Sequence, residues 1–110
     1  MINILVIKNN QKIITLEATG HSGYAEQGSD IVCSAVSTLM QNLAVGLTEV
    51  LKLDPRVIID EQIPHMSVSL ESINEEQEQS AQVLMQTTLL SLKEIASGYS
   101  NYIKIKEKQR

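Results

Sequence analysis

The sequence predicts an α+β fold of two layers, in which two helices pack on a mostly antiparallel sheet in the order β-β-α-β-β-α-β. Two segments, which begin near Asp30 and near Asn74, repeat apolar residues every three or four positions, as amphipathic helices do. The remaining segments are short and apolar or alternating, and turn residues separate them, as in hairpin-connected strands. The 110 residues suit a single domain, residues 1–110.

The first two strands form a predicted hairpin. Residues 2–8 are apolar, Asn9-Asn10 suits a tight turn because asparagine tolerates a positive φ, and residues 13–18 return as the second strand. Residues 20–29 follow and hold three of the five glycines, which predicts a mobile loop.

The first helix is predicted from Asp30 to Asp54-Pro55, about six turns. Its apolar stripe consists of Val32, Val36, Leu39, Met40, Leu43, Leu47, Val50 and Leu51. Its polar face is uncharged and carries Ser34, Ser37, Thr38, Gln41 and Asn42. Two interpretations remain open: a half-buried helix, or a helix whose face contacts another subunit.

The second half of the chain predicts three strands around one helix. Residues 57–59 form a strand, Ile63-Pro64 a turn, and residues 65–70 a half-buried strand because polar and apolar residues alternate. The helix starts at a capping box, either Ser72 to Glu75 or Asn74 to Gln77, and Gly98 is its predicted C-terminal cap. Its apolar face is Ala81, Leu84, Met85, Thr88, Leu92 and Ile95. Residues 102–106 form a last strand at the sheet edge; the pattern leaves the strand order undetermined.

Composition excludes several classes of function. The net charge of −4, with no Trp or Phe and three Tyr, disfavours direct binding to nucleic acid. No apolar run is expected to approach the roughly 20 residues that span a membrane. The N-terminal residues lack a basic leader and a cleavage site, so we expect no signal peptide, and a lone cysteine points to the reducing cytoplasm.

Cys33 is the candidate nucleophile because it lies in the first turn of the first predicted helix. Unpaired N–H groups and the positive end of the dipole favour an anion there, and a thiolate is such an anion. His21, flanked by glycines, is the nearest proton partner, and a Cys–His pair can attack a carbonyl carbon. The alternative is that Cys33 is a small buried hydrophobe.

Other polar groups near Cys33 are candidates for supporting roles. Asp30 either caps the helix or orients His21. The backbone N–H of Cys33 or Ser34 is a candidate oxyanion donor, and Ser37 either supports the thiol or is an ordinary helix serine. His65 is expected at the surface. No close-spaced ligand pair and no phosphate-loop pattern occur, so we expect no metal and no cofactor.

Residues 20–37 resemble the ribosomal-processing cysteine protease family, called Prp. The motif is Gly20-His21, then Gly23-Tyr24-Ala25, then Gly28-x-Asp30-Ile31-Val32-Cys33-x-Ala35-Val36-Ser37. The resemblance extends over the whole chain in length and element order. Ser22 and Ser34 depart from the family, where alanine is common, and both changes are small.

The resemblance implies a cytoplasmic, homodimeric endopeptidase that removes a short N-terminal extension from large-subunit ribosomal protein twenty-seven. It implies that Cys33 is the nucleophile and His21 the general base, while Asp30 and Ser37 occupy motif positions of less settled role. It also implies that residues 22–29 form a lid, with Gly20, Gly23 and Gly28 as hinge positions. The precursor peptide would be the partner.

Two rival functions remain at this stage. In the first, the protein is a non-catalytic ribosome-associated binding module in which Cys33 only packs. In the second, Cys33 is a redox-active thiol.

Overall fold

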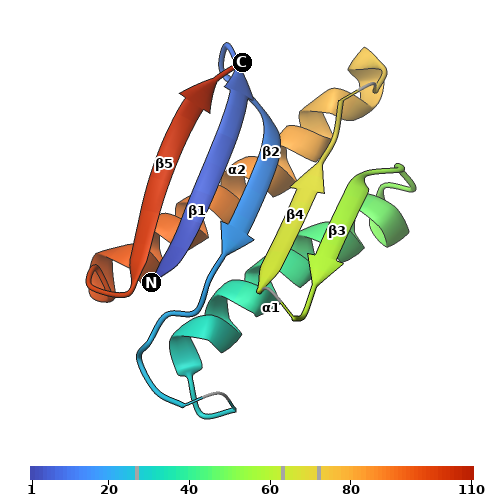
Figure 1. The fold of residues 1–110 in the computed structure, drawn as a ribbon. Coiled ribbons are helices and arrows are strands. Elements are labelled where there is room, and N and C mark those ends of the chain that lie inside the picture. The colour runs from blue at the N-terminus through green and yellow to red at the C-terminus, as the bar shows by residue number, and fades with distance from the viewer. Residues whose placement is uncertain (27, 63, 72) are drawn as a thin grey trace.

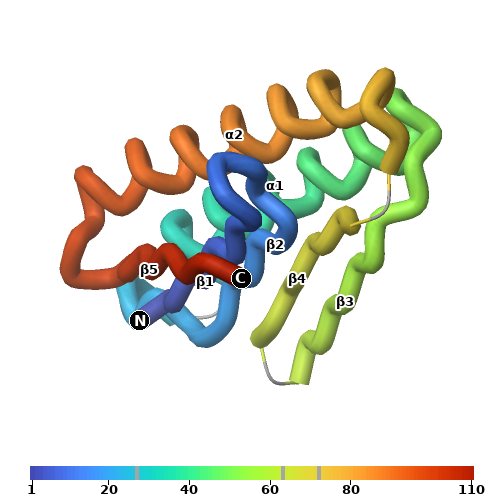
Figure 2. The backbone as a smooth tube through the Cα atoms, turned by 90° about the horizontal axis from the view of Figure 1, so that it is seen from above, coloured from blue at the N-terminus to red at the C-terminus, as the bar shows by residue number. Residues whose placement is uncertain are grey.

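The computed structural model describes residues 1–26, 28–62, 64–71 and 73–110. Within them the chain forms, in order, β1 (Ile2–Asn9), β2 (Lys12–Thr19), α1 (Ile31–Val45), the wide helical turn η1 (Gly46–Val50), β3 (Arg56–Asp60), β4 (His65–Ser69), α2 (Glu75–Gly98) and β5 (Ile103–Gln109). This confirms the predicted order of strands and helices. Both helices cover the same face of the sheet, which makes two layers (Figures 1 and 2).

The sheet has the strand order β3-β4-β2-β1-β5, which the sequence pattern left open. The β1–β2, β2–β4 and β3–β4 pairs are antiparallel, and β5 pairs with β1 in parallel at the edge. The first hairpin closes as predicted: Asn9 pairs with Lys12, and Asn10 takes a φ of 60°. The prediction of a mostly antiparallel sheet with the last strand at its edge is therefore confirmed.

The core lies between the sheet and the two helices. Helix α1 contributes four side chains along one face, and the strands contribute the alternate residues that point inward. Each fully buried aliphatic side chain contributes roughly 1.5–3 kcal/mol. The main members are Ile2, Ile4, Val6, Ile13, Leu16, Val32, Val36, Met40, Leu43, Val68, Met85 and Leu92. This packing holds α1 against the sheet at a fixed position.

The first helix ends earlier than predicted. Its last turn widens over Gly46–Val50, where the Leu51 N–H donates to the Gly46 carbonyl, and Lys52 then adopts a φ of 55° that turns the chain away before Asp54-Pro55. A Cβ at Gly46 would come within 2.9 Å of Leu84 Cδ1, so glycine permits this close approach of α2. Because the wide turn changes the helical phase, Val50 leaves the apolar stripe and is 72% exposed.

The second helix confirms one of the two alternative starts. Asn74 is the N-cap and its side chain accepts from the Gln77 N–H at 2.9 Å; Ser72, like Ile63 of the predicted turn, lies outside the described residues. The predicted Gly98 cap is wrong. Gly98 is the last helical residue and Tyr99 is the C-cap, with its N–H bonded to the carbonyls of Ile95 and Ala96. This ending requires no left-handed residue and therefore no glycine.

The expectation that no apolar stretch reaches membrane-spanning length is wrong for the segment Ile31–Val50. These 20 residues are long and apolar enough to cross a membrane by length and composition alone. An amphipathic core helix meets the same two criteria, and Val32, Val36, Met40 and Leu47 of this segment are buried against the rest of the chain. Packing in the core thus accounts for the apolar composition of this face.

Candidate active site

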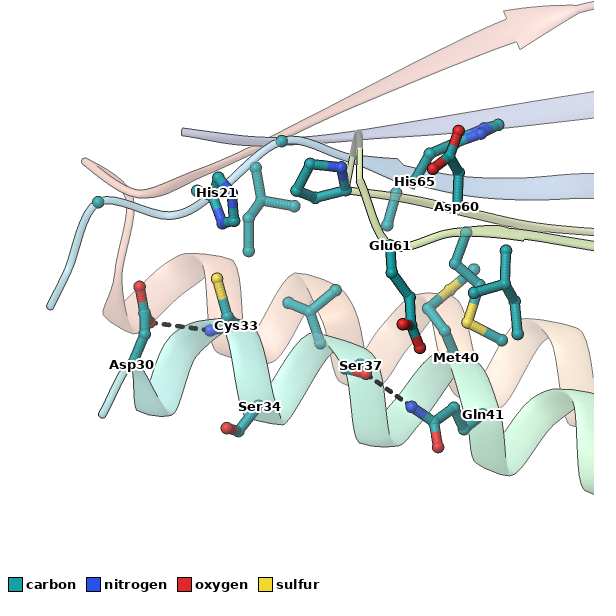
Figure 3. Close-up of a pocket in the computed structure, with 18 of the residues that line it drawn as sticks. His21, Asp30, Cys33, Ser34, Ser37, Met40, Gln41, Asp60, Glu61 and His65 are labelled. Atoms are coloured by element: carbon teal, nitrogen blue, oxygen red, sulfur yellow. Dashed lines mark hydrogen bonds between the residues drawn. The ribbon is translucent and has the colours of Figure 1, made fainter. Parts of the chain in front are cut away.

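The segment after β2 carries the chain over the start of α1. Gly20 begins it with a φ of 90°, and its N–H donates to the Pro64 carbonyl at 2.9 Å. A Cβ at this position would lie 2.6 Å from the Met1 carbonyl oxygen, so a side chain is sterically excluded. His21 consequently lies over the first turn of α1 (Figure 3), and Ser22 is hydrogen-bonded to that turn.

Cys33 is half-buried in that first turn, and its sulfur faces the loop rather than the core (Figure 3). The Ser22 backbone N–H donates to Sγ at 3.4 Å. The exposed His21 ring lies across the groove from the same sulfur. The structure therefore brings the two residues of the predicted Cys–His pair to one groove, and Cys33 packs against the edge of the core but is only half-buried.

Asp30 is the N-cap of α1, which confirms the capping interpretation. Its Oδ1 accepts from the backbone N–H groups of Val32 and Cys33, both at 3.0 Å. Its other oxygen accepts from the hydroxyl of Ser22, which is itself buried. Among the described residues, none of the hydrogen bonds of Asp30 involves His21, so the structure gives no contact for the alternative orienting role.

The charge on Asp30 is strongly stabilised. Burial raises the pKa of this carboxyl, but hydrogen bonds from the Ser22 hydroxyl and from the backbone N–H groups of Cys33 and Ala25 outweigh it, so the pKa falls from 3.8 to about 2. The carboxylate is therefore ionised throughout the neutral pH range, and it fixes both the helix start and the loop.

The amides at the helix start are occupied. The Cys33 N–H bonds to the Asp30 carboxylate, and the Ser34 N–H bonds to the Asp30 carbonyl at 3.1 Å in the first helical turn. The two amides predicted as oxyanion donors thus already have acceptors, and the amide that faces the sulfur is that of Ser22. In the sequence, Ser22 differs from its neighbours only as a small departure from the family motif.

The loop of residues 22–29 lines the same groove through Gly23, Ala25 and Gly28. Tyr24 anchors it from outside, because its ring packs edge-to-face on Tyr99 and Tyr102 with centroid distances of 5.6 and 5.3 Å. These three rings are all the aromatic residues of the chain. The loop is thereby attached to the turn between α2 and β5 as well as to α1.

The groove has a volume of about 560 Å³ and runs from Cys33 along α1 to the turn between β3 and β4. Its apolar lining includes Val36, Met40, Ile59, Pro64 and Met66. Ser37 also lines it, with its hydroxyl accepting from Gln41 Nε2 at 2.8 Å. Away from Cys33, Glu61 extends from the β3–β4 turn towards α1, in the part of the groove that also holds Asp60 and Met40 (Figure 3). The groove thus combines apolar side chains with two carboxyl groups distant from Cys33.

His65, predicted at the surface, is half-buried at the rim of this groove. Its Nε2 lies 2.6 Å from Glu17 Oε1 on the neighbouring strand β2. Its ring points away from Cys33, unlike that of His21 (Figure 3). In the described part of the chain, no three His, Cys, Asp or Glu side chains are arranged to hold a metal ion.

The opposite wall of the groove was not predicted from the sequence. Ile59, Pro64 and Met66 reach it because β4 pairs with β2, a pairing that depends on strand order. Of these three positions the sequence indicated only Met66, through the alternation of residues 65–70.

A cysteine that faces a histidine loop in a groove is the arrangement of a thiol-dependent hydrolase, and similar proteins identify its kind. The family model for cysteine protease Prp matches residues 1–104, so this chain belongs to the Prp family of cysteine proteases. The ribosomal processing cysteine protease Prp of Bacillus subtilis is 27% identical over 107 residues, covering 96% of each chain.

Solved structures agree with this assignment. A Streptococcus mutans protein matches with a TM-score of 0.87 at 30% identity and covers 100% of this chain and 96% of its own. The Staphylococcus aureus processing protease Prp, solved with a covalently linked product peptide, matches with a TM-score of 0.85 at 26% identity and covers 98% of this chain and 100% of its own. The protein is a cysteine protease of this fold and acts on peptide substrates.

Proposed function

We propose that this protease uses Cys33 as its nucleophile and His21 as its general base to remove the N-terminal extension of large-subunit ribosomal protein twenty-seven. The observation that carries the proposal is the position of Cys33: its sulfur faces the His21 loop at the open end of a groove. A fully buried sulfur would have no access to a peptide, whereas Cys33 is half-buried and lines the groove.

The proposed reaction is acyl transfer. His21 takes the proton of Cys33, the thiolate attacks the scissile carbonyl carbon, and the tetrahedral intermediate collapses to a thioester while the departing amine receives a proton from His21. Water, deprotonated by His21, then hydrolyses the thioester and returns the thiol. Asp30 supports this chemistry indirectly, because it fixes the first turn of α1 on which Cys33 lies.

The groove supports a ribosomal precursor as substrate. Its apolar lining suits a peptide with apolar side chains, and the carboxyl groups of Asp60 and Glu61 suit a basic protein. Relatives of this chain are named for ribosomal processing. The net charge of −4 also favours a basic protein over RNA as partner.

The test is cleavage of a synthetic peptide that spans the extension, followed by mass spectrometry. We expect wild-type protein to cut at one bond, Cys33→Ala to lose all turnover, and His21→Gln to lose most of it. His65→Gln is the matched control, because it removes a histidine from the same groove whose ring points away from the sulfur. Full turnover by Cys33→Ala would refute the nucleophile assignment.

A second measurement separates substrate choice from chemistry. Binding of the extension peptide without cleavage by wild-type protein would favour the non-catalytic ribosome-associated module. Cleavage of unrelated peptides at the same rate as the extension peptide would leave the Cys–His chemistry intact and overturn the proposed substrate.

We also propose that the protein works as a homodimer in the cytoplasm. The outer face of α1 supports the dimer, since Thr38 and Asn42 are exposed and uncharged and Val45 is 54% exposed beside them. The single free thiol at the site supports a reducing compartment.

A further inference from the structure

Resting on the proposed function, we infer that the backbone N–H of Ser22 is the oxyanion donor of this protease. The amides at the start of α1 are the usual candidates for such a role, but those of Cys33 and Ser34 are both bonded to Asp30. The Ser22 amide, which belongs to the loop and not to the helix, donates to Sγ at 3.4 Å.

The geometry of the reaction makes this amide suitable. When the Cys33 thiolate attacks, a C–S bond forms, and the π electrons of the carbonyl move to its oxygen, which lies one bond from the carbon attached to Sγ. A donor aimed at Sγ therefore lies close to the developing oxyanion. Effective donors lie about 2.7–3.1 Å from that oxygen. When the intermediate collapses, those electrons re-form the C=O bond, and the C–N bond breaks.

The Ser22 side chain holds this amide in place. Its hydroxyl donates to the Asp30 carboxylate and accepts from the Tyr24 N–H at 3.0 Å, and the residue is only 3% exposed. Donors are effective when they are fixed before the charge develops, because no reorganisation is then required. Asp30 thus positions both partners: Cys33 through the helix cap and Ser22 through its hydroxyl.

The decisive test removes the N–H of Ser22 and leaves every side chain unchanged. The only cysteine of the chain, Cys33, allows a synthetic fragment 1–32 to be ligated to a recombinant fragment 33–110. Replacing Ser22 in that fragment with the corresponding hydroxy acid converts its amide into an ester, which removes the N–H and keeps the side chain. The matched control places the same amide-to-ester change at Gln11 in the exposed β1–β2 turn.

We expect kcat for the Ser22 ester to fall about 10²–10³-fold with KM unchanged, and the Gln11 ester to match the all-amide protein. The affinity for N-acetyl-phenylalanyl-alaninal, an aldehyde that forms a tetrahedral adduct with the thiol, should fall similarly. The affinity for the matching alcohol and the rate of Cys33 alkylation by iodoacetamide should stay unchanged, since neither forms an oxyanion. Ser22→Ala should lose about tenfold in kcat, because the amide remains but both hydrogen bonds of the hydroxyl, to Asp30 and from Tyr24, are lost.

Two results would overturn the inference. The first is an unchanged kcat and an unchanged aldehyde affinity in the Ser22 ester. The second is an alkylation rate that falls as much as kcat, because the amide would then act on the thiolate and not on the oxyanion. The aldehyde measurement decides the matter even if the extension peptide is not the substrate. Turnover by Cys33→Ala, in contrast, would defeat the proposed function itself.

Discussion

The hydroxyl of Ser22 donates a hydrogen bond to the same carboxylate of Asp30 that caps α1. One side chain therefore determines where the helix begins and where the loop crosses it. Because Cys33 belongs to the helix and Ser22 to the loop, the distance between the sulfur and the loop amide depends on this carboxylate. Changes at Asp30 should consequently affect stability and catalysis together.

Asp30→Ala should destabilise the protein by about 1 kcal/mol or more and reduce turnover. The helix loses its cap, and the Ser22 hydroxyl loses its buried acceptor. Asn74→Ala is the control, since it removes the N-cap of α2 and should cost a similar free energy of unfolding with full activity. Urea unfolding and peptide cleavage measure the two effects. Equal activity losses in both variants would contradict a local role for Asp30.

Stability should fall as the pH decreases from about 4 to about 2. Burial raises the pKa of Asp30, but its hydrogen bonds lower it further, to about 2 from 3.8, so between these values the unfolded chain binds more protons than the folded one. The stabilisation is complete above the unfolded value and is lost as the pH falls through the folded value. The free energy of unfolding of wild type minus that of Asp30→Asn should shrink over this range; a constant difference would disprove the linkage.

Gly20 and Gly23 should respond differently to substitution. Gly20→Ala should cost about 1–3 kcal/mol, because it combines a φ of 90° with a Cβ 2.6 Å from the Met1 carbonyl oxygen. Gly23→Val, at a φ of 78° with no atom near the added Cβ, should slow turnover and leave the domain folded. Thermal unfolding and cleavage rates check this, with Gly98→Ala as a helical control. Wild-type kinetics in Gly23→Val would remove the argument for a lid hinge.

A charge on the outer face of α1 should dissociate the proposed dimer. Thr38→Glu combined with Val45→Glu places two like charges where an uncharged, partly apolar surface would be buried. Leu90→Glu, at an exposed apolar position of α2, is the control and should not change the oligomeric state. Sedimentation equilibrium measures the mass, and a wild-type monomer at assay concentration would refute the dimer.

The sequence alone was enough for the element order and for the neighbourhood of Cys33. Helix and strand periods depend on which residues are buried, and the motif of residues 20–37 lies within one continuous segment. The cap at Asp30 was predictable for the same reason, because capping links residues two or three positions apart. The end of α1 was not, since it depends on how closely Leu84 of α2 approaches Gly46.

Tertiary structure decided everything that joins distant segments. The strand order placed β4 beside β2 and so built the far wall of the groove from Ile59, Pro64 and Met66. The path of the loop over α1 decided that the amide of Ser22, and not those at the helix start, faces the sulfur. Local conformational preferences act over a few residues, whereas these contacts join elements that meet only when the core packs. The pattern of residues along the chain does not specify which of these elements become neighbours.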